Sequence, residues 1–564
     1  MIPAAATRRF PGSIAAVTLV LAGLTLYILR LDNVAGLIGD DAWYVVLAKG
    51  IAQGSGPYVI SSAGTQFLSQ VYPPGFPAIL SLVMLVSREY PGNMALLKGV
   101  SIMAMIGAGL LTYRYAVRYR GLSPMIGTLV AIVTVTTPAL VFLATSTLMS
   151  EAVFLFVELA AVVLIERTAS AHDDRTGRRL AVSAGALAAA AFLIRTAGMT
   201  IGLSALFYFV WKRRWQSAAV YAATAACLVM PWMIYARTHA PARAELVDHG
   251  GLMSMAYSDQ FWTKEAGTVT SRHVSPRELP ARIERNAVNI AIRDMGGIFV
   301  PLLFRTPFES GLEVIGLGPP EGGQVPSMGS AFGTKAVSFA LTALAALGFF
   351  TTVRRRMTVS EPMVVLALGM IILWPFWTFR FVLPLVPFLL CYFVSGLEAL
   401  ANAAQARAGL RIALRPESAV RIFLFVIVGL NVLDHTQYIA QAYGDPRGAS
   451  WKAHADDIDQ VFRWIREKGT HDGAIAADNP ALVYLLTGRR TVAISSTVDK
   501  WGRWQRMGVR YVVSLSDGEL LVDRRATLRF KLGDENIWAF ELTGGQSAIS
   551  MTQSLDRAVP NNTR

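Results

Sequence analysis

The feature that most constrains this chain is a series of long apolar segments that recurs up to about residue 440. The first, residues 14–31, is long enough to cross the roughly 30 Å hydrocarbon core of a bilayer as a helix. Hydrophobic residues make up 53% of the chain and charged residues 16%, against about 25% charged residues in soluble proteins. We therefore expect a polytopic α-helical membrane protein.

The formal net charge of +14 could suggest a nucleic-acid partner. Its distribution argues against one, because Arg and Lys gather in short clusters between the apolar segments. Such clusters stay on the cytoplasmic side and set the orientation of membrane helices. Arg8 and Arg9 then place the N-terminus in the cytoplasm, and no nucleic-acid partner is expected. Cys227 and Cys391 both fall inside apolar segments, so a disulfide framework is not expected.

Alternation of apolar segments and basic clusters predicts about eleven spans, with the N-terminus cytoplasmic and the C-terminus outside. An apolar segment at residues 73–87 is too short to cross unaided, and we expect it to be re-entrant or to lie on the surface. With that assignment every large basic cluster lies inside. The predicted spans are residues 14–31, 94–113, 124–141, 151–165, 180–195, 199–211, 217–235, 335–353, 362–378, 381–397 and 421–439.

Two loops and a tail complete the predicted organisation. Residues 1–440 form the transmembrane module, with a first outer loop at 32–93 and a second at 236–333. Residues 443–564 are soluble in character. There "GAIAAD", "TVAIS" and "RYVVSL" are typical of buried strands, helical patterns lie between them, and "LRFKLGDENIWAFEL" is typical of a hairpin. Strands that alternate with helices predict a small extracytoplasmic α/β domain.

Charged residues at the predicted outer ends of spans are the candidates for function. Asp40 and Asp41 follow the first span in "IGDDAWYV". One acid could cap the next helix while the other is solvated, or one could be a general base that its neighbour orients. Glu151, Arg195 and Arg380 lie at the same face. Each arginine alone could extend to lipid headgroups, but charges at membrane depth tend to mark function, and this set suits a ligand with a phosphate and a reacting hydroxyl.

Several of these residues stand in motifs that resemble the C-type glycosyltransferase superfamily. The motifs are "GDDAWYV", the "YPPGFP" loop, Glu151 and "RFVLPLVPFLL", and the nearest relatives are the protein O-mannosyltransferases and the lipid A aminoarabinose transferases. The resemblance covers roughly residues 10–440. Asp41 stands where glutamate is commoner in the family, and Tyr72 stands where a basic residue often precedes the prolines. The segment "DNPALVYLLTGRRTV" is similar to extracytoplasmic tails of bacterial members.

This resemblance implies an inverting transfer of a sugar from a polyprenyl-phosphate donor to an acceptor hydroxyl, at the outer face of a bacterial cytoplasmic membrane. The lipid phosphate leaves as an anion and needs cations, and the hydroxyl needs a base. The acceptor is an envelope protein, lipid or glycan, and membrane lipids surround the enzyme. The resemblance makes Asp40 the base, Asp41 a positioning group or a ligand of a metal or sugar, Glu151 the second acid, and Tyr72 and Arg380 donor-phosphate positions; Lys49 and Arg195 are added as donor-binding candidates from position alone.

Other interpretations stay open. Asp40, Asp41 and Glu151 could hold one divalent metal ion or none, so metal dependence is undecided. An oligosaccharide ligase or polymerase that uses a lipid diphosphate is the alternative enzyme. A flippase for lipid-linked sugars would place charges in mid-span and show an inverted repeat. The charges instead cluster at the outer ends of the spans, and the spans do not pair into halves. A catalytically inactive scaffold is the remaining alternative.

Overall fold

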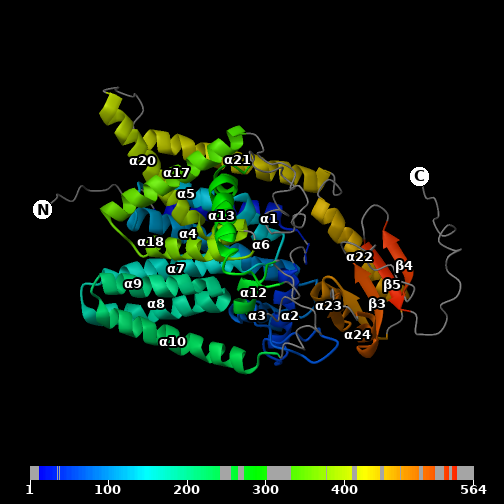
Figure 1. Ribbon diagram of the computed structural model, residues 1–564. Helices are drawn as coiled ribbons and strands as arrows, with labels where there is room; N and C mark the ends of the chain where they lie inside the picture. Colours follow the sequence, from blue (N-terminus) through cyan, green and yellow to red (C-terminus); the bar gives the residue numbers. More distant parts are fainter. Residues whose placement is uncertain are drawn as a thin grey trace.

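A bundle of long helices and a smaller sheet with its own helices lie side by side in the computed structural model (Figure 1). The sheet lies at the end of the bundle that carries α2 and α3 (Figure 1). Parts of the second outer loop and the last 22 residues, 543–564, lie outside the described residues. The structure describes residues 12–32, 34, 36, 39–241, 256–264, 272–301, 332–376, 378–408, 416–444, 450–469, 472–494, 500–514, 526–532 and 537–542.

The bundle consists of long helices and short helices that cover one of its ends. The long helices are α1 (Gly12–Arg30), α4 (Met94–Arg118), α5 (Pro124–Thr136), α7 (Glu151–Ala169), α8 (Asp174–Ile194), α9 (Met199–Trp211), α10 (Trp215–Thr238), α17 (Phe332–Arg355), α18 (Ser360–Leu373), α20 (Val386–Ala408) and α21 (Pro416–Gly444). The short elements are α2 (Asp40–Ala52), α3 (Gly75–Val86), α6 (Pro138–Thr145), η1 (Thr196–Gly198), α12 (Tyr257–Trp262), α13 (Leu279–Asn289), η3 (Ile290–Asp294), α14 (Met295–Phe299), α19 (Thr378–Val382) and η4 (Leu383–Leu385).

Every predicted span overlaps at least one of these helices, but residues 124–141 cover both α5 and α6, and residues 381–397 cover α19, η4 and α20. The count of eleven spans is not confirmed. In the described part of the chain, six helices are long and apolar enough to cross a membrane, or seven if the bent pair α5 and α6 forms one span. The helices α1, α9 and α18 contribute only shorter apolar stretches. At residues 73–87 the structure has α3, a helix of 12 residues. At about 18 Å it is too short to cross.

Two local features of the sequence shape the bundle. The helices α5 and α6 meet at an angle of 50°, because Pro138 has no amide hydrogen and forces the preceding residue out of the helical region. Thr137 accordingly has φ −57° and ψ 117°. The helices α17 and α20 approach closely at Gly348, where an added Cβ would lie 1.6 Å from the carbonyl oxygen of Tyr392. Small residues permit this contact, as is common between membrane helices.

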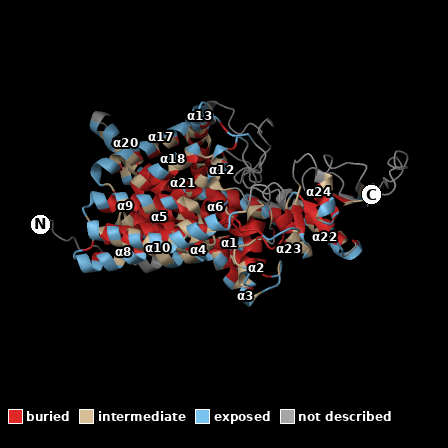
Figure 2. Cartoon of the chain, turned by 60° about the horizontal axis from the view of Figure 1, so that its bottom comes forward, coloured by how far each residue is buried: buried red, intermediate tan, exposed pale blue. Residues whose placement is uncertain are grey.

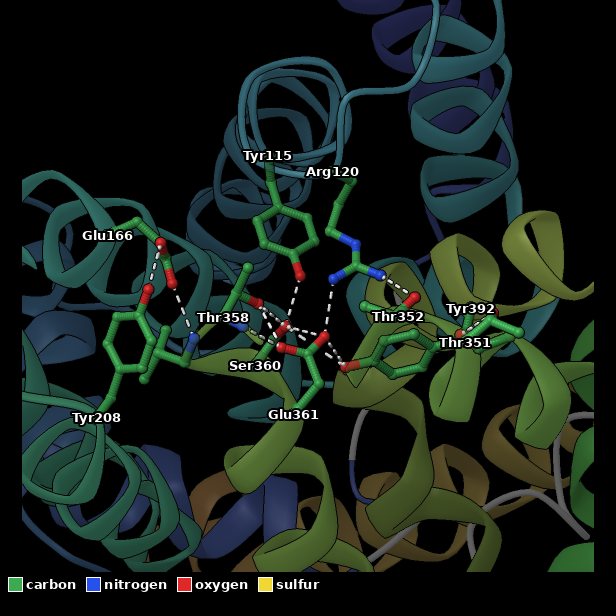
Figure 3. Close-up of polar contacts among 12 residues, drawn as sticks. Tyr115, Arg120, Glu166, Tyr208, Thr351, Thr352, Thr358, Ser360, Glu361 and Tyr392 are labelled. Atoms are coloured by element: carbon green, nitrogen blue, oxygen red, sulfur yellow. Dashed lines mark hydrogen bonds and ion pairs between the residues drawn. The ribbon is translucent and has the colours of Figure 1, made fainter. Parts of the chain in front are cut away.

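A buried polar cluster joins four helices of the bundle (Figure 3). Arg120, just after α4, donates to Glu361 of α18 at 2.7 Å and to Thr352 of α17 at 2.7 Å. Glu361 also accepts from the Thr358 hydroxyl at 2.6 Å and from Tyr392 of α20 at 3.2 Å. Because the pair is almost fully hydrogen-bonded, it can be buried without a large penalty. Figure 3 also shows Tyr115, Glu166, Tyr208 and Ser360 in this network.

The C-terminal part is a mixed five-stranded sheet with the strand order β2-β1-β3-β5-β4. Its elements are α22 (Ser450–Lys468), β1 (Ala474–Ala477), α23 (Pro480–Thr487), β2 (Thr491–Ala493), α24 (Lys500–Arg506), β3 (Val509–Ser514), β4 (Ala526–Leu532) and β5 (Ile537–Leu542). The strand β1 is parallel to β2 and β3, while β5 is antiparallel to β3 and β4. The three sequence segments typical of strands coincide with β1, β2 and β3, and the expected hairpin is β4 and β5.

The sheet is joined directly to the segment that follows α2. Thr491 of β2 donates its amide to the Ser61 carbonyl at 2.8 Å, and the Ala63 amide donates to the Thr491 carbonyl at 3.0 Å. The Asn479 amide group donates to the Gly36 carbonyl at 3.0 Å. One contiguous set of buried residues runs from the bundle through α2 and α23 to one face of the sheet (Figure 2). The C-terminal part therefore supports the segment that follows α2 and, before α2, Gly36.

Candidate active site

The helix α2 begins at Asp40, so both acids of the pair lie in its first turn. Gly39 precedes them with φ +75°, a backbone conformation that glycine adopts readily. Consecutive residues of an α-helix point about 100° apart. The two carboxylates therefore face different surroundings, and only that of Asp40 faces the other charged candidates.

Asp40 is held by two donors from distant parts of the chain. Its Oδ2 accepts from Arg380 Nη1 at 2.8 Å, and its Oδ1 accepts from the Tyr72 hydroxyl at 2.5 Å. Burial, with the nearby Asp40 charge, raises the pKa of Tyr72 well above its usual value, so Tyr72 remains a donor. The Asp40 side chain is 24% exposed. It is thus reachable from solvent, as a group that receives a proton from a substrate must be.

Glu151 lies at the start of α7 and is fully buried. Its Oε1 accepts from Arg195 Nη1 at 2.8 Å and from Arg380 Nε. Its Oε2 is buried without a hydrogen-bond partner among the described residues. The Arg380 guanidinium thus bridges Asp40 and Glu151, and Glu151 in turn joins it to Arg195. Charge-assisted bonds of this kind are the strong ones and fix the two guanidinium groups.

Three further residues belong to this cluster, and the sequence analysis did not identify them as site residues. Ser150 accepts from Arg195 Nη1 at 3.0 Å and lies 3.1 Å from the Tyr44 hydroxyl. The rings of Tyr44 and Tyr72 are 4.6 Å apart. Tyr257, from the second outer loop, donates to the Val71 carbonyl beside Tyr72. The position of Tyr44, one helical turn after Asp40, could have pointed to it. Tyr257 is one of three aromatic residues in the loop 236–333 that could contact an acceptor, but anchoring at the membrane interface explains such residues equally well from the sequence.

Asp41 lies outside this cluster. Its Oδ2 accepts from the Gly36 amide at 2.8 Å and its Oδ1 from the Ala42 amide at 2.9 Å, and the side chain is fully buried. Burial raises the pKa of its carboxyl to about 6, although both backbone amides lower it. Asp41 therefore ties the segment before α2 to the helix. It faces away from Arg380.

Lys49 also lies outside the cluster. It follows Asp40 by nine residues, about 13 Å along the helix axis. Its Nζ lies 5.0 Å from the ring centroid of Tyr484 on α23, a cation–π contact that reaches the C-terminal part. Burial lowers the pKa of the Lys49 amine.

The three acids considered as metal ligands do not converge. Asp40 and Glu151 both bind guanidinium groups, and Asp41 binds backbone amides. Within the part of the chain that the structure describes, no three His, Cys, Asp or Glu side chains are grouped closely enough to hold a metal ion. The cation that joins Asp40 and Glu151 in this structure is Arg380.

Comparisons with known proteins find one matching family model and several similar folds. Residues 71–287 match the model of glycosyltransferase family 87. The fold is similar to ArnT from Cupriavidus metallidurans in the apo state, with a TM-score of 0.56, 12% identity and coverage of 94% of this chain and 98% of ArnT. For ArnT bound to undecaprenyl phosphate the TM-score is 0.54 and the identity 11%, with the same coverage of both chains. Comparison with curated protein sequences gives no match.

The oligosaccharyltransferase of Archaeoglobus fulgidus, tethered to an acceptor peptide containing the NVT sequon, is also similar. It gives a TM-score of 0.52 and 14% identity, and the match covers 91% of this chain and 70% of that enzyme. At such identities the similarity shows a shared fold. Together with the family 87 match, it confirms that this chain resembles the C-type membrane glycosyltransferases.

Proposed function

We propose that this chain is an inverting glycosyltransferase that moves a sugar from a polyprenyl-phosphate donor to an acceptor hydroxyl, at the outer face of a bacterial cytoplasmic membrane. The observation that carries the proposal is the contact between Asp40, a candidate base, and Arg380, a candidate phosphate ligand, at 2.8 Å. The family 87 match and the fold shared with ArnT, which has been solved with undecaprenyl phosphate, support it.

Arg380 and Arg195 bind the donor phosphate in this proposal. A sugar phosphodiester carries one negative charge, and the lipid phosphomonoester that leaves carries a second as the sugar–oxygen bond breaks. Guanidinium groups fixed beforehand by Glu151 stabilise this growing charge without reorganising. The largely buried surroundings strengthen that interaction, since the Arg380 side chain is 13% exposed and Glu151 is fully buried. Glu151 is thus a positioning residue for both arginines.

Asp40 accepts the proton of the acceptor hydroxyl. The hydroxyl oxygen attacks the anomeric carbon from the face opposite the phosphate, and the electron pair of the broken bond stays on the phosphate oxygen. Attack from that face inverts the anomeric configuration. Arg380 Nη1 donates to Asp40 Oδ2 at 2.8 Å. A donor phosphate that draws Arg380 away therefore also frees Asp40 Oδ2 to accept the proton. Tyr72 keeps Oδ1 in place through its hydrogen bond.

Asp41 and Lys49 act indirectly in this proposal. Asp41 accepts from the Gly36 and Ala42 amides. These bonds fix the start of α2 and so the position of Asp40 relative to Arg380. Lys49 contacts Tyr484 of α23 and helps to hold the C-terminal part against α2. Neither is expected to touch the donor.

Sugar transfer by the purified protein in lipid tests the proposal. The donors are a panel of polyprenyl-phosphate hexoses, pentoses and aminoarabinose, with a crude envelope fraction as acceptor. We expect transfer from one donor, and a loss of roughly 10² or more in Asp40→Asn, as for removal of a general base. Asp174→Asn, which removes a carboxylate that is 67% exposed on α8, is the matched control.

The outcomes separate the alternatives. If Asp40→Asn folds, binds donor and retains full activity, Asp40 is not the base. Transfer only from a lipid-diphosphate oligosaccharide identifies a ligase, which the fold shared with the oligosaccharyltransferase also permits. Movement of lipid-linked sugar across the bilayer without transfer identifies a flippase.

A further inference from the structure

A cavity of about 630 Å³ lies at the junction of the bundle and the C-terminal part. The end of α1, the start of α4, the end of α21, and the helices α22 and α23 form its walls. None of the residues that make up the Asp40–Arg380 cluster lines it. Its size is that of a small-molecule site, and the proposed transfer reaction does not use it.

Arg30, the last residue of α1, forms the cationic wall of this cavity. It is 3% exposed, and its Cζ lies 3.0 Å from the centroid of the Tyr438 ring. Its Nε and Nη1 are buried and have no hydrogen-bond acceptor among the described residues. A buried charged donor without an acceptor is costly and calls for an explanation. An anionic oxygen of a bound ligand would supply the acceptor.

Two acids lie close enough to Arg30 to act on its charge, Asp434 of α21 and Asp32, and neither accepts from its Nε or Nη1. Asp32 lines the cavity too, but its Oδ1 accepts from Lys98 Nζ at 2.9 Å and its Oδ2 from the Ser146 hydroxyl at 2.7 Å. The start of α4, at Met94 and Ala95, forms the neighbouring wall. In the first turn of this 25-residue helix the Met94 amide donates to the Pro91 carbonyl and the Leu96 amide to the Asn93 carbonyl. The helix end therefore offers the Ala95 amide and a partial positive charge. Arg30 and α4 therefore favour the same kind of ligand group, a phosphate.

A second wall of the cavity is acidic. Asp456 and Asp459 of α22 both line it. Asp459 pairs with Arg463 at 2.9 Å, whereas Asp456 is exposed and has no ion pair among the residues described. A ligand that satisfies Arg30 and Asp456 together carries an anion and a cation.

The rim of the cavity is apolar and continues onto the outer surface of the bundle. Leu29 of α1 is 47% exposed and Tyr443 of α21 is 68% exposed, and both line the cavity. The neighbouring exposed side chains of these helices, Ile28 and Leu433, are apolar as well. Such a surface on a membrane bundle faces acyl chains, so the cavity can be entered from the bilayer.

We propose that this cavity binds the headgroup of a membrane phospholipid that carries both a phosphate and a primary ammonium. The phosphate accepts from Arg30 and from the first turn of α4, the ammonium pairs with Asp456, and the acyl chains lie over Leu29 and the exposed surface of α21. The lipid site stands on its own contacts and does not depend on the proposed transfer.

Native mass spectrometry of the full chain, delipidated in detergent, tests this proposal. The probes are short-chain phosphatidylethanolamine, phosphatidylglycerol of the same chain length, and free phosphoethanolamine. We expect wild type to bind phosphatidylethanolamine at least five-fold more tightly than phosphatidylglycerol. Asp456→Asn should remove this preference, and Arg30→Gln should weaken both lipids about ten-fold. Glu467→Gln, an exposed acid on α22 outside the cavity, should change neither.

Asp456 is exposed, so its substitution tests the proposal even if Arg30→Gln fails to fold. Equal binding of the two lipids by wild type would overturn the proposal, and so would an unchanged preference in Asp456→Asn. If free phosphoethanolamine binds as tightly as the lipid, the ligand of this cavity is a soluble phosphate compound and the proposal of a lipid is wrong. A loss of sugar transfer with lipid preference intact would concern only the catalytic proposal.

Discussion

Replacement of Asp41 by Asn tests whether the second acid of the pair has a structural role. In wild type the Asp41 carboxylate is fully buried between the Gly36 and Ala42 amides. Desolvation raises the pKa of this carboxyl from 3.8 to about 6, against the lowering effect of the two amides. The folded protein therefore binds this proton more tightly than the unfolded chain does.

The sign of the pH effect follows from that difference. Because the folded-state pKa is raised, the unfolding free energy is highest below the unfolded pKa near 4. It falls as the pH rises and levels off above about pH 6. Two pKa units at about 1.4 kcal/mol each give a loss of about 3 kcal/mol from this group. Asp41→Asn cannot ionise, so relative to wild type it should gain about 3 kcal/mol between pH 4 and pH 7.

Thermal unfolding in detergent at steps between pH 4 and pH 7.5 measures this difference. Other groups titrate equally in both proteins, so only the wild-type-minus-variant difference is compared. Asp174→Asn, an exposed carboxylate on α8, should show no such trend. Transfer activity of Asp41→Asn should stay within a few-fold of wild type. A pH profile parallel to wild type, or a loss of transfer as large as in Asp40→Asn, would refute the structural role.

Three further predictions follow from single contacts. Arg380→Lys, which cannot bridge Asp40 and Glu151 with one planar fork, should lower kcat/KM for donor by roughly 10² or more in a transfer assay; unchanged kcat/KM would remove Arg380 from the phosphate site. Glu361→Gln leaves the buried Arg120 charge unpaired, so thermal unfolding should show an unfolding free energy lower by about 3 kcal/mol or more. The donor KM should stay unchanged, and a shifted KM would contradict a structural role. Asn479→Ala removes the bond to the Gly36 carbonyl and the N-cap bond from the Leu482 amide, so it should lower the unfolding free energy by about 2 kcal/mol and speed amide exchange at Gly36; unaltered exchange at Gly36 would show that the C-terminal part does not support it.

The helices were predictable because their signal is local. A long apolar segment bounded by basic clusters is visible in any window of the sequence, and every predicted span overlaps at least one helix. The number of crossings is a different question. Helix α7 carries Glu151, Glu158 and Glu166 within 19 residues, and the bend at Thr137 shortens α5. Whether such helices cross depends on neighbours that bury their polar groups, which no local window contains.

The candidate site was predictable residue by residue but not as an arrangement. Charges at the ends of apolar segments identified Asp40, Glu151, Arg195 and Arg380 individually. Their pairing joins positions up to 340 residues apart in the chain, which spacing cannot show. The roles of Asp40 and Asp41 differ because α2 begins at Asp40 and turns its neighbour toward Gly36. A helix that began one residue later would bring Asp41 to the position that Asp40 occupies.

Charge balance in the cluster explains why one arginine contacts both acids. Asp40 and Glu151 carry two negative charges, and Arg195 and Arg380 carry two positive charges. A donor phosphate adds a negative charge that competes with the carboxylates for the arginines. Which arginine–carboxylate contact it displaces depends on the free energy of leaving that carboxylate unpaired. The Glu151 contacts are fully buried, and a carboxylate left unpaired there is costly. Asp40 is 24% exposed, and water can replace Arg380 at its Oδ2. The contact that yields to the phosphate is therefore the one that frees the proposed base.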